Sequence, residues 1–248
     1  MQVKIVGIIS SPSLNGNTAV LVREALRAAA GCGAEVEEIF LPALKLQYCA
    51  GCYHCMSEGG CPLPDGFEEI RRKLYACDGI VIGSPTYVQK PNAMMTNLFN
   101  RLGLFTPYTS SLAGKYVVGM STAEGYGASK VAKDLTGIAS GMFGFGYVTG
   151  TLGVVRGEVR IEQKPEALQR ARDLGRKLVD DIERGRRYPF QALLPRLGTA
   201  LIARRFVLRS ILANREGRMK AVYENLVTRG LIRPVAKAGD LRERLVSG

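Results

Sequence analysis

Five short apolar runs, each followed by a stretch with helical spacing, restrict the fold of this sequence more than any other feature. The runs are rich in Val and Ile and cover residues 3–10, 35–42, 78–87, 115–122 and 146–155. Apolar positions at helical intervals follow at residues 19–31, 65–77, 92–103, 127–143 and 164–185. Parallel strands covered by helices on both faces are typically continuous apolar runs. The sequence therefore predicts an α/β fold with a doubly wound, five-stranded parallel sheet.

The net charge of +12 is concentrated at the end of the chain. Residues 184–248 carry 15 Lys and Arg against 4 Asp and Glu, whereas residues 1–183 carry 19 against 18. We therefore predict a nearly neutral globular domain over residues 1–183 and a basic, helical C-terminal extension over residues 184–248. Residues 196–213, after Pro195, form an amphipathic helix candidate within the extension.

Three roles are open for the extension. It is apolar around more than one helical face, which favours an arm that builds a homodimer or homotetramer. Its charge also suits an acidic protein partner such as ferredoxin, or a peripheral contact with an anionic membrane. Nucleic acid is disfavoured because few aromatic residues lie among the arginines and no binding motif is present.

The start of the chain and its cysteine content predict where the protein works. Residues 1–10 form a strand candidate with no basic segment or cleavage site, which disfavours a secretory signal, and no apolar run is long enough to cross a bilayer. We expect a cytoplasmic protein. Thiols are kept reduced there, so the six cysteines favour metal or redox chemistry over structural disulfides.

In doubly wound sheets ligands bind beyond the carboxyl ends of the strands, so the loops after the first, third and fourth strands are the candidate site. The first loop, "SSPSLNGNT", places hydroxyl and amide side chains at a helix start, where backbone N–H groups bind anions. It has neither the P-loop lysine nor the dinucleotide glycine pattern. Either a phosphate site or an ordinary helix cap is consistent with these residues.

The stretch "GIISSPSLNGNTAVLVREAL" resembles the FMN phosphate loop of the NADPH-dependent FMN reductase group of flavodoxin-like proteins. The resemblance implies a flavodoxin-like fold, FMN as the cofactor, and a phosphate site made by Ser11, Ser13, Asn15, Gly16, Asn17 and Thr18. Ser13 stands where the family usually has arginine, which removes a cationic contact.

Two further loops continue the resemblance. The stretch "GSPTYVQKPNAMMTNLFNRL" resembles the family's second signature, which implies that the flavin ring lies along Pro85, Thr86, Tyr87 and Val88. Relatives tend to have Lys and Asp at the positions of Thr96 and Asn100. The loop "STAEGYGAS" is similar to the third flavin loop, which would add Thr122, Ala123, Glu124, Gly125, Tyr126 and Gly127.

Four cysteines lie within thirteen residues in "YCAGCYHCMSEGGC", in a segment over residues 48–62 after the second strand. The spacing C-x2-C-x2-C-x5-C is too compact for the two separated ligand pairs of most structural zinc sites. It suits a cubane iron–sulfur cluster, since a compact loop can bring each sulfur to a different iron. Free or regulatory thiols and zinc remain alternatives.

The same segment resembles the iron–sulfur flavoprotein branch of the family. This implies that Cys49, Cys52, Cys55 and Cys61 ligate a [4Fe-4S] cluster, and that electrons pass from a donor, NAD(P)H or ferredoxin, to a small-molecule or protein acceptor. No side chain need act as acid or base, because the chemistry is on the flavin. Two alternatives are a cluster-free NAD(P)H-dependent reductase of flavins, quinones or metal ions, and a non-enzymatic flavin or thiol redox sensor.

Overall fold

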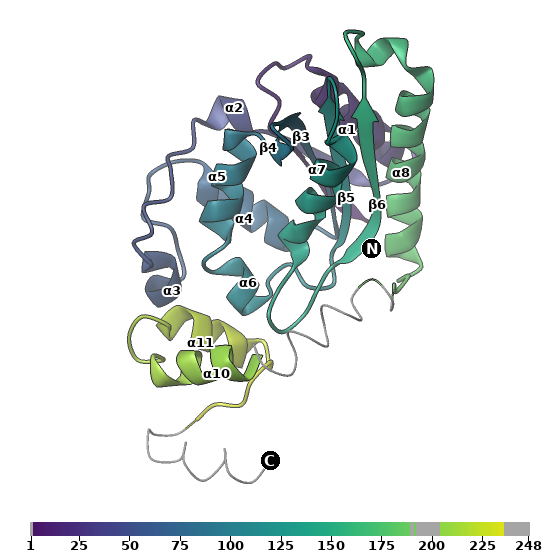
Figure 1. Ribbon diagram of the computed structural model, residues 1–248. Coiled ribbons are helices and arrows are strands. Elements are labelled where there is room, and N and C mark those ends of the chain that lie inside the picture. Colours follow the sequence, from purple (N-terminus) through teal and green to yellow (C-terminus); the bar gives the residue numbers. More distant parts are fainter. Residues whose placement is uncertain (1, 189–190, 192–203, 236–248) are drawn as a thin grey trace.

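The computed structural model describes residues 2–188, 191 and 204–235 and is built around a parallel sheet (Figure 1). Its parallel strands are β1 (Lys4–Ile9), β2 (Glu35–Phe40), β3 (Gly79–Tyr87), β5 (Tyr116–Ala123) and β6 (Tyr147–Val155). The spatial order is β2-β1-β3-β5-β6. This is the flavodoxin-like order, in which later strands are added on one side of β1 after β2 has been placed on the other. The predicted fold is confirmed. The short strand β4 (Lys90–Pro91) pairs antiparallel with the end of β3.

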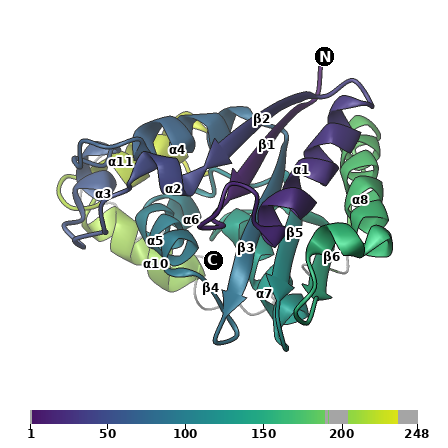
Figure 2. The ribbon, with the colours of Figure 1, turned by 90° about the horizontal axis from the view of Figure 1, so that it is seen from above.

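Two layers of helices cover the sheet (Figure 2). The helices α1 (Asn17–Ala30) and α8 (Pro165–Glu183) pack on one face, and α4 (Phe67–Ala76), α5 (Ala93–Leu102) and α7 (Ala128–Leu135) pack on the other. Alternate residues of β1 point into the two cores: Ile5 and Ile9 join the α1/α8 core, whereas Val6 and Ile8 join the α4/α5/α7 core. This two-sided burial explains why the strands are continuous apolar runs.

Short elements depart from the predicted pattern. The helix expected over residues 127–143 is shorter, because α7 ends at Leu135 and only a 3-10 turn, η1 (Thr136–Ala139), follows. Glycines at 137 and 141 disfavour its continuation. A second 3-10 turn, η2 (Ile161–Gln163), precedes α8, and the one-turn helices α2 (Leu41–Leu44), α3 (His54–Glu58) and α6 (Thr106–Thr109) complete the domain.

The described part of the basic extension folds back on the chain. Helices α10 (Arg204–Ala213) and α11 (Lys220–Thr228) lie beside α3 and α6, away from the sheet (Figure 1). Pro195 and the first part of the predicted amphipathic helix lie outside the described residues. Among the helices that the structure describes, none has the length and apolarity needed to span a bilayer.

Candidate functional site

The first loop joins β1 to α1 and leaves the start of α1 open. Gly16 caps the helix with extended backbone, no side chain caps the first turn, and that turn holds no acidic residue. The free N–H groups of the first turn are therefore available to an anion. Ser11 is 4% exposed, and its hydroxyl, which has no hydrogen-bond partner among the described residues, is not one of the fully enclosed polar atoms. A Cβ at position 16 would lie 2.1 Å from Ser11 Oγ, so a larger residue there would displace that hydroxyl.

The other polar residues of this loop hold it to neighbouring segments. Asn17 Oδ1 accepts from the backbone N–H of Ile161 at 2.9 Å, and Thr18 Oγ1 bonds Thr122 Oγ1 at 2.7 Å. Arg160 Nη2 donates to the backbone carbonyl of Asn15 at 2.8 Å. Ser13 and Asn15 are exposed. Arg160, which follows the last strand, thus brings a guanidinium to the loop, and the same guanidinium is paired with Glu162 at 2.8 Å.

The end of β3 turns into a hairpin with strained backbone. Val88 and Gln89 have φ values of 48° and 58° at the tip, and two consecutive positive φ values are typical of a type I′ turn. A β-branched residue is rare in this region and stores strain. The strained turn leaves the side chains of Tyr87 and Val88 exposed, at 52% and 95%.

A polar network fixes the root of this hairpin. Asn92 Nδ2 donates to the carbonyl of Ser10 at 2.6 Å, and the Asn92 N–H donates to Ser84 Oγ at 3.0 Å. Ser121 Oγ donates to the carbonyl of Ser84 at 2.7 Å and bonds Thr86 Oγ1 at 2.8 Å. The network therefore ties the carboxyl ends of β1, β3 and β5 together.

The third loop follows β5 and lies against the hairpin. Gly127 caps α7 at a φ of 88°, and a Cβ there would lie 3.0 Å from Gln89 Cγ. Thr122 and Ala123 are buried, whereas Glu124, Gly125 and Tyr126 are exposed. Since β1, β3 and β5 are parallel, all three predicted loops lie at one edge of the sheet.

Exposed large apolar side chains gather at this edge. Those described are Leu14, Tyr48, Tyr53, Tyr87, Val88, Tyr126, Val155, Val159 and Phe206. Six of them, Leu14, Tyr87, Val88, Tyr126, Val155 and Val159, are at the last residues of β3 and β6 or in the loops that follow the strands, whereas Tyr48 and Tyr53 belong to the cysteine segment and Phe206 to α10. An exposed apolar patch with a polar rim is typical of a binding surface.

The four cysteines of the segment line one small cavity of about 30 Å³, together with Tyr53, Leu63, Arg101 and Leu104 among others. Cys52 is exposed and the other three thiols are partly buried. Burial, and to a lesser extent the neighbouring thiols of Cys61, Cys52 and Cys49, together raise the pKa of Cys55 to about 11. Within the described residues, no three or more His, Cys, Asp or Glu side chains converge on a single metal-ion position.

Helix α5 holds both ends of this segment. Asn97 Nδ2 donates to the carbonyl of Gln47 at 3.1 Å, and Asn97 Oδ1 accepts from the Cys49 N–H at 3.3 Å. One turn later, Arg101 donates to the carbonyl of Gln47 at 3.0 Å and to Cys61 Sγ at 3.1 Å. Both side chains are buried.

Arg101 is paired with Asp65, which follows the fourth cysteine. Both carboxylate oxygens accept from the guanidinium, at 2.6 and 3.1 Å, and the guanidinium carbon lies 4.2 Å from the centre of the Phe67 ring. Burial lowers the pKa of Arg101, but the hydrogen bonds to Asp65 and Cys61 outweigh it and raise that pKa. Burial likewise acts to raise the pKa of Asp65, but hydrogen bonds from Arg101, Gln47 and Phe67 hold it below its usual value.

The basic extension covers the outside of the cysteine segment. Met56 of α3 is buried in an apolar cluster with Phe105, Val207, Ile211, Met219, Val222 and Leu226. The Arg218 guanidinium lies 3.5 Å from the centre of the Tyr53 ring, between Cys52 and Cys55 in the sequence. Much of the apolar surface of α10 and α11 is therefore buried within the chain itself.

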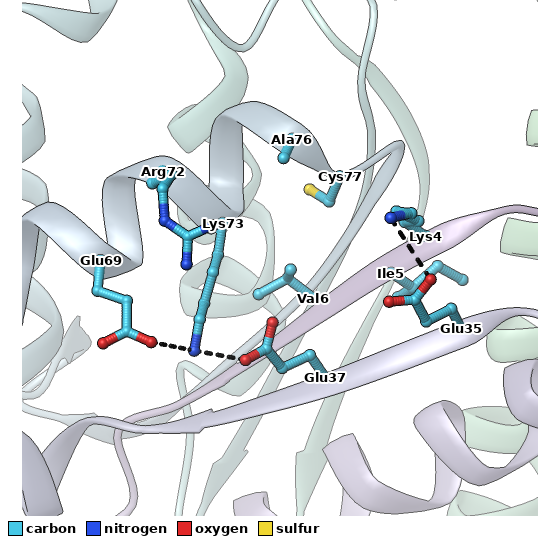
Figure 3. Close-up of a pocket in the computed structure, with 10 residues that line it drawn as sticks. All are labelled: Lys4, Ile5, Val6, Glu35, Glu37, Glu69, Arg72, Lys73, Ala76 and Cys77. Carbon is cyan, nitrogen blue, oxygen red and sulfur yellow. Dashed lines mark ion pairs between the residues drawn. The ribbon is translucent and has the colours of Figure 1, made fainter.

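A larger cavity, of about 410 Å³, lies between α4 and the first halves of β1 and β2 (Figure 3). Lys73 pairs there with Glu37 and, at 2.8 Å, with Glu69, and Lys4 pairs with Glu35 at 3.5 Å. These lining charges are neutralised by their neighbours, and the cavity lies at the end of the sheet opposite the three loops. We assign it no role in the candidate site.

A family model described as NADPH-dependent FMN reductase matches residues 3–158. The match runs through β6 and contains the three loops and the four cysteines. The chain belongs to the NADPH-dependent FMN reductase family. Membership places it among flavin-dependent oxidoreductases, with FMN as the cofactor of the family, as the sequence predicted.

Two relatives of this family member are iron–sulfur flavoproteins. One from Methanocaldococcus jannaschii is 45% identical over 98 residues, which are 40% of this chain and 51% of that protein. One from Archaeoglobus fulgidus is 32% identical over 185 residues, which are 73% of this chain and 80% of that protein. The alignment thus spans about half of the first relative and four fifths of the second.

Solved structures share the fold of this FMN reductase family member. A flavone reductase superposes with a TM-score of 0.59 at 21% identity, covering 73% of this chain and 63% of that one. RosB, solved with bound 8-demethyl-8-formylriboflavin-5'-phosphate, has a TM-score of 0.54 at 14% identity and covers 95% of this chain and 90% of its own. At these identities the likeness shows the fold alone.

Sequence reasoning missed several residues of the site. Arg160, Asp65, Asn97 and Arg101 were not predicted, although Asn97 and Arg101 lie one turn apart on the helix face that also buries Met95, Leu98 and Leu102. Polar residues on such a face are a signal of a specific buried partner.

Proposed function

We propose that this protein binds FMN at the carboxyl ends of β1, β3 and β5 and passes electrons through FMN and a [4Fe-4S] cluster on the four cysteines. One observation carries the proposal. The three loops that resemble those of the family, the open start of α1 and most of the exposed apolar side chains all lie at the carboxyl ends of the strands. The cysteine segment follows β2, which ends at the same edge.

The first loop offers partners for the FMN phosphate. The unpartnered hydroxyl of Ser11 and the free N–H groups at the start of α1 are donors without competing side chains. Asn17 and Thr18 keep their side-chain bonds to Ile161 and Thr122, and so they shape the loop. Arg160 donates to the loop backbone while it is paired with Glu162, so it adds a hydrogen bond to the loop rather than an unpaired positive charge.

The hairpin and the third loop offer an apolar wall for the flavin ring. Tyr87, Val88 and Tyr126 are exposed at this edge, and the hairpin is held in place by Ser84, Asn92 and Ser121. Bound FMN supplies the ability to take up a hydride as an electron pair and to release electrons singly. The protein's residues then have to hold the ring and exclude water from one side of it.

The cysteine segment fits a multi-iron cluster better than a single metal ion. Four thiols line one cavity, and their C-x2-C-x2-C-x5-C spacing is too compact for the two separated ligand pairs of most structural zinc sites. A cubane needs each sulfur at a different iron. The Nε–H of Arg101 is buried without an acceptor among the described residues, and a group with sulfur atoms in the adjoining cavity would supply one. Cys49, Cys52, Cys55 and Cys61 would hold the cluster, which would supply one-electron chemistry when bound.

The donor, the acceptor and the assembly are part of the proposal. NAD(P)H and an acidic protein such as ferredoxin are the candidate donors, and the acceptor is a small molecule or a protein. A homodimer or homotetramer in the cytoplasm remains our prediction. The basic extension beside the cysteine segment supports a negatively charged protein as one partner.

Anaerobic purification followed by an absorbance spectrum and by iron and acid-labile sulfide assays tests the proposal. We expect bound FMN, and about four irons and four sulfides per chain for a cubane cluster. Flavin without iron, in protein never exposed to oxygen, would refute the cluster. Absence of both flavin and iron would refute the proposed function as a whole.

Two properties of the cysteines favour a cluster-free reductase as the second candidate. Cys52 is exposed, and the pKa of Cys55 of about 11 keeps that thiol protonated at neutral pH. Both properties suit free thiols. Rapid reduction of bound FMN by NADH or NADPH, in protein that holds no iron, would select this candidate.

A further inference from the structure

Arg101 lies at the point where the two ends of the cysteine segment meet. Gln47 precedes the first cysteine by two residues, and Asp65 follows the fourth cysteine by four. The Arg101 guanidinium bonds both, and Asp65 Oδ2 also accepts from the Gln47 N–H at 2.8 Å. These bonds close the base of the segment.

The guanidinium has little freedom to move from this position. Its side chain is fully buried, Asp65 binds it through both carboxylate oxygens, and the Phe67 ring lies against it. A bidentate carboxylate pair fixes the plane of a guanidinium as well as its charge. Nη2, which also donates to Asp65, reaches Cys61 Sγ at 3.1 Å, and Nε–H has no acceptor among the described residues.

We propose that Arg101 is a positioning residue of the four-cysteine centre. It closes the base of the segment and places a hydrogen-bond donor on the sulfur of Cys61, which makes that sulfur unlike the other three. This inference rests on the proposed function for its redox part. Hydrogen bonds to ligating sulfurs are among the features that set the potential of an iron–sulfur centre.

The direction of the effect follows from charge. One-electron reduction by an external reductant such as dithionite adds one negative charge to the centre, with no change in its ligands. A donor on Cys61 Sγ stabilises the more negative form more strongly. Loss of that donor therefore shifts the midpoint potential to a more negative value.

The test compares Arg101→Lys with the wild-type protein. Lysine keeps the positive charge near Asp65, but one ammonium cannot replace the fork that reaches Gln47, Asp65 and Cys61 together. The matched control is Arg172→Lys on α8, where an arginine pairs with Glu24 at 2.6 Å on the opposite face of the sheet. Iron and sulfide content and the midpoint potential are measured in a dithionite titration followed by electron paramagnetic resonance.

We expect Arg101→Lys to lower the equilibrium constant for reduction of the centre roughly tenfold, which is about the contribution of one hydrogen bond to a charged group. For one electron, a tenfold change in this constant shifts the midpoint potential by about 59 mV. The flavin potential and the control variant should not change. An unchanged potential at full iron content would overturn the inference. If Arg101→Lys does not fold, the double variant Arg101→Met/Asp65→Asn removes both charges together, and the same shift is expected.

Amide hydrogen exchange of metal-free protein separates this inference from the proposed function. If the wild-type protein binds FMN but no iron, the cluster proposal fails, and the exchange result alone then tests whether Arg101 positions the cysteine segment. Faster exchange over residues 47–65 in Arg101→Lys, but not in Arg172→Lys, would support the positioning role. Equal exchange in all three proteins would overturn it.

Discussion

Gly16 shows how one residue type can determine whether the first loop accepts an anion. A side chain at this position would overlap the hydroxyl of Ser11, which is the donor that the loop leaves free. We expect Gly16→Ala to weaken FMN binding roughly tenfold, about the value of one hydrogen bond to a charged group. Quenching of flavin fluorescence on titration with the apoprotein measures it.

The matched control is Gly31→Ala at the other end of α1. The added methyl group there meets only backbone oxygens at 3.5 Å, an ordinary contact, and the backbone is already helical. Equal FMN affinities for the wild-type protein and Gly16→Ala would contradict a phosphate site at this loop.

Thr18 and Thr122 form the direct link between the first and third loops. Their hydroxyls bond at 2.7 Å, and both residues are buried. Thr18→Val leaves the Thr122 hydroxyl without this partner, so the free energy of unfolding should fall by about 1–3 kcal/mol. Urea unfolding measures the loss. Thr18→Ser keeps the hydroxyl, so its free energy of unfolding should fall less. A fall as large as that of Thr18→Val would show that packing of the threonine methyl group, and not the hydrogen bond, stabilises the link.

Cys77 gives a pH dependence that is independent of the cysteine segment. Burial raises the pKa of its thiol from 9.0 to about 11 in the folded protein. Between these values the unfolded chain has lost the proton that the folded protein still holds, so stability falls as the pH rises. The loss from this thiol should reach about 1–2 kcal/mol by pH 10.5.

Urea unfolding at pH 8 and pH 10.5 checks this loss. Cys77→Ala lacks the thiol, so its free energy of unfolding should decline less between the two pH values. The same decline in both proteins would show that Cys77 does not titrate in this range. Cys32 is exposed, so Cys32→Ala is the control that should leave the decline unchanged.

Much of the candidate flavin site at the carboxyl ends of β1, β3 and β5 could be proposed from single residues, because its sequence signals are local. A glycine, a hydroxyl and a helix start lie within eight residues of the first loop. Arg101, Asp65 and Arg160 could not be predicted in the same way. Arg101 and Asp65 are 36 residues apart, and Arg160 and Asn15 are 145 apart, so only the folded sheet brings them together.

At the scale of elements, the extension and the cysteine segment depend on each other. Ile211 of α10 is fully buried in the cluster that holds Met56 of α3. We expect Ile211→Ala to destabilise this part by about 2–5 kcal/mol and to increase hydrogen exchange in α3. The control is Phe206→Ala on the same helix, since Phe206 is 74% exposed. Unchanged exchange in α3 would contradict the coupling.

Helix α3 also shows why some elements escape sequence reasoning. It has five residues, begins after Tyr53 at a φ of 59° and ends at Gly59 at a φ of 81°. Such a short helix has too few turns for a periodic apolar signal. Its one buried apolar side chain, Met56, packs on helices more than 140 residues later in the sequence. The long strands and helices were predicted, because each contains enough residues to show its own periodic apolar pattern.

At the scale of the whole molecule, the uneven charge gives a prediction about the electron donor. If the donor is an acidic protein that meets the extension, its rate of reducing the protein should fall roughly tenfold as salt screens the attraction. Stopped-flow reduction at low and high ionic strength measures the rate. Arg205→Glu/Arg209→Glu, at exposed positions of α10, should slow it, whereas Arg27→Glu on α1 should not. A rate independent of salt would exclude this route.

Helix α5 links the two candidate centres through its two ends. Its cap, Asn92, bonds Ser10 and Ser84 at the flavin edge, and Arg101 near its last turn bonds Cys61. Ten residues of helix span about 15 Å, and each residue turns the helix by about 100°. The length of α5 therefore sets the distance between the two candidate centres, and the rotation per residue sets the direction in which Arg101 points. One residue inserted after Asn97 would leave the cap in place but rotate Arg101 away from the sulfur. Helix length would then constrain evolution here as strictly as residue identity.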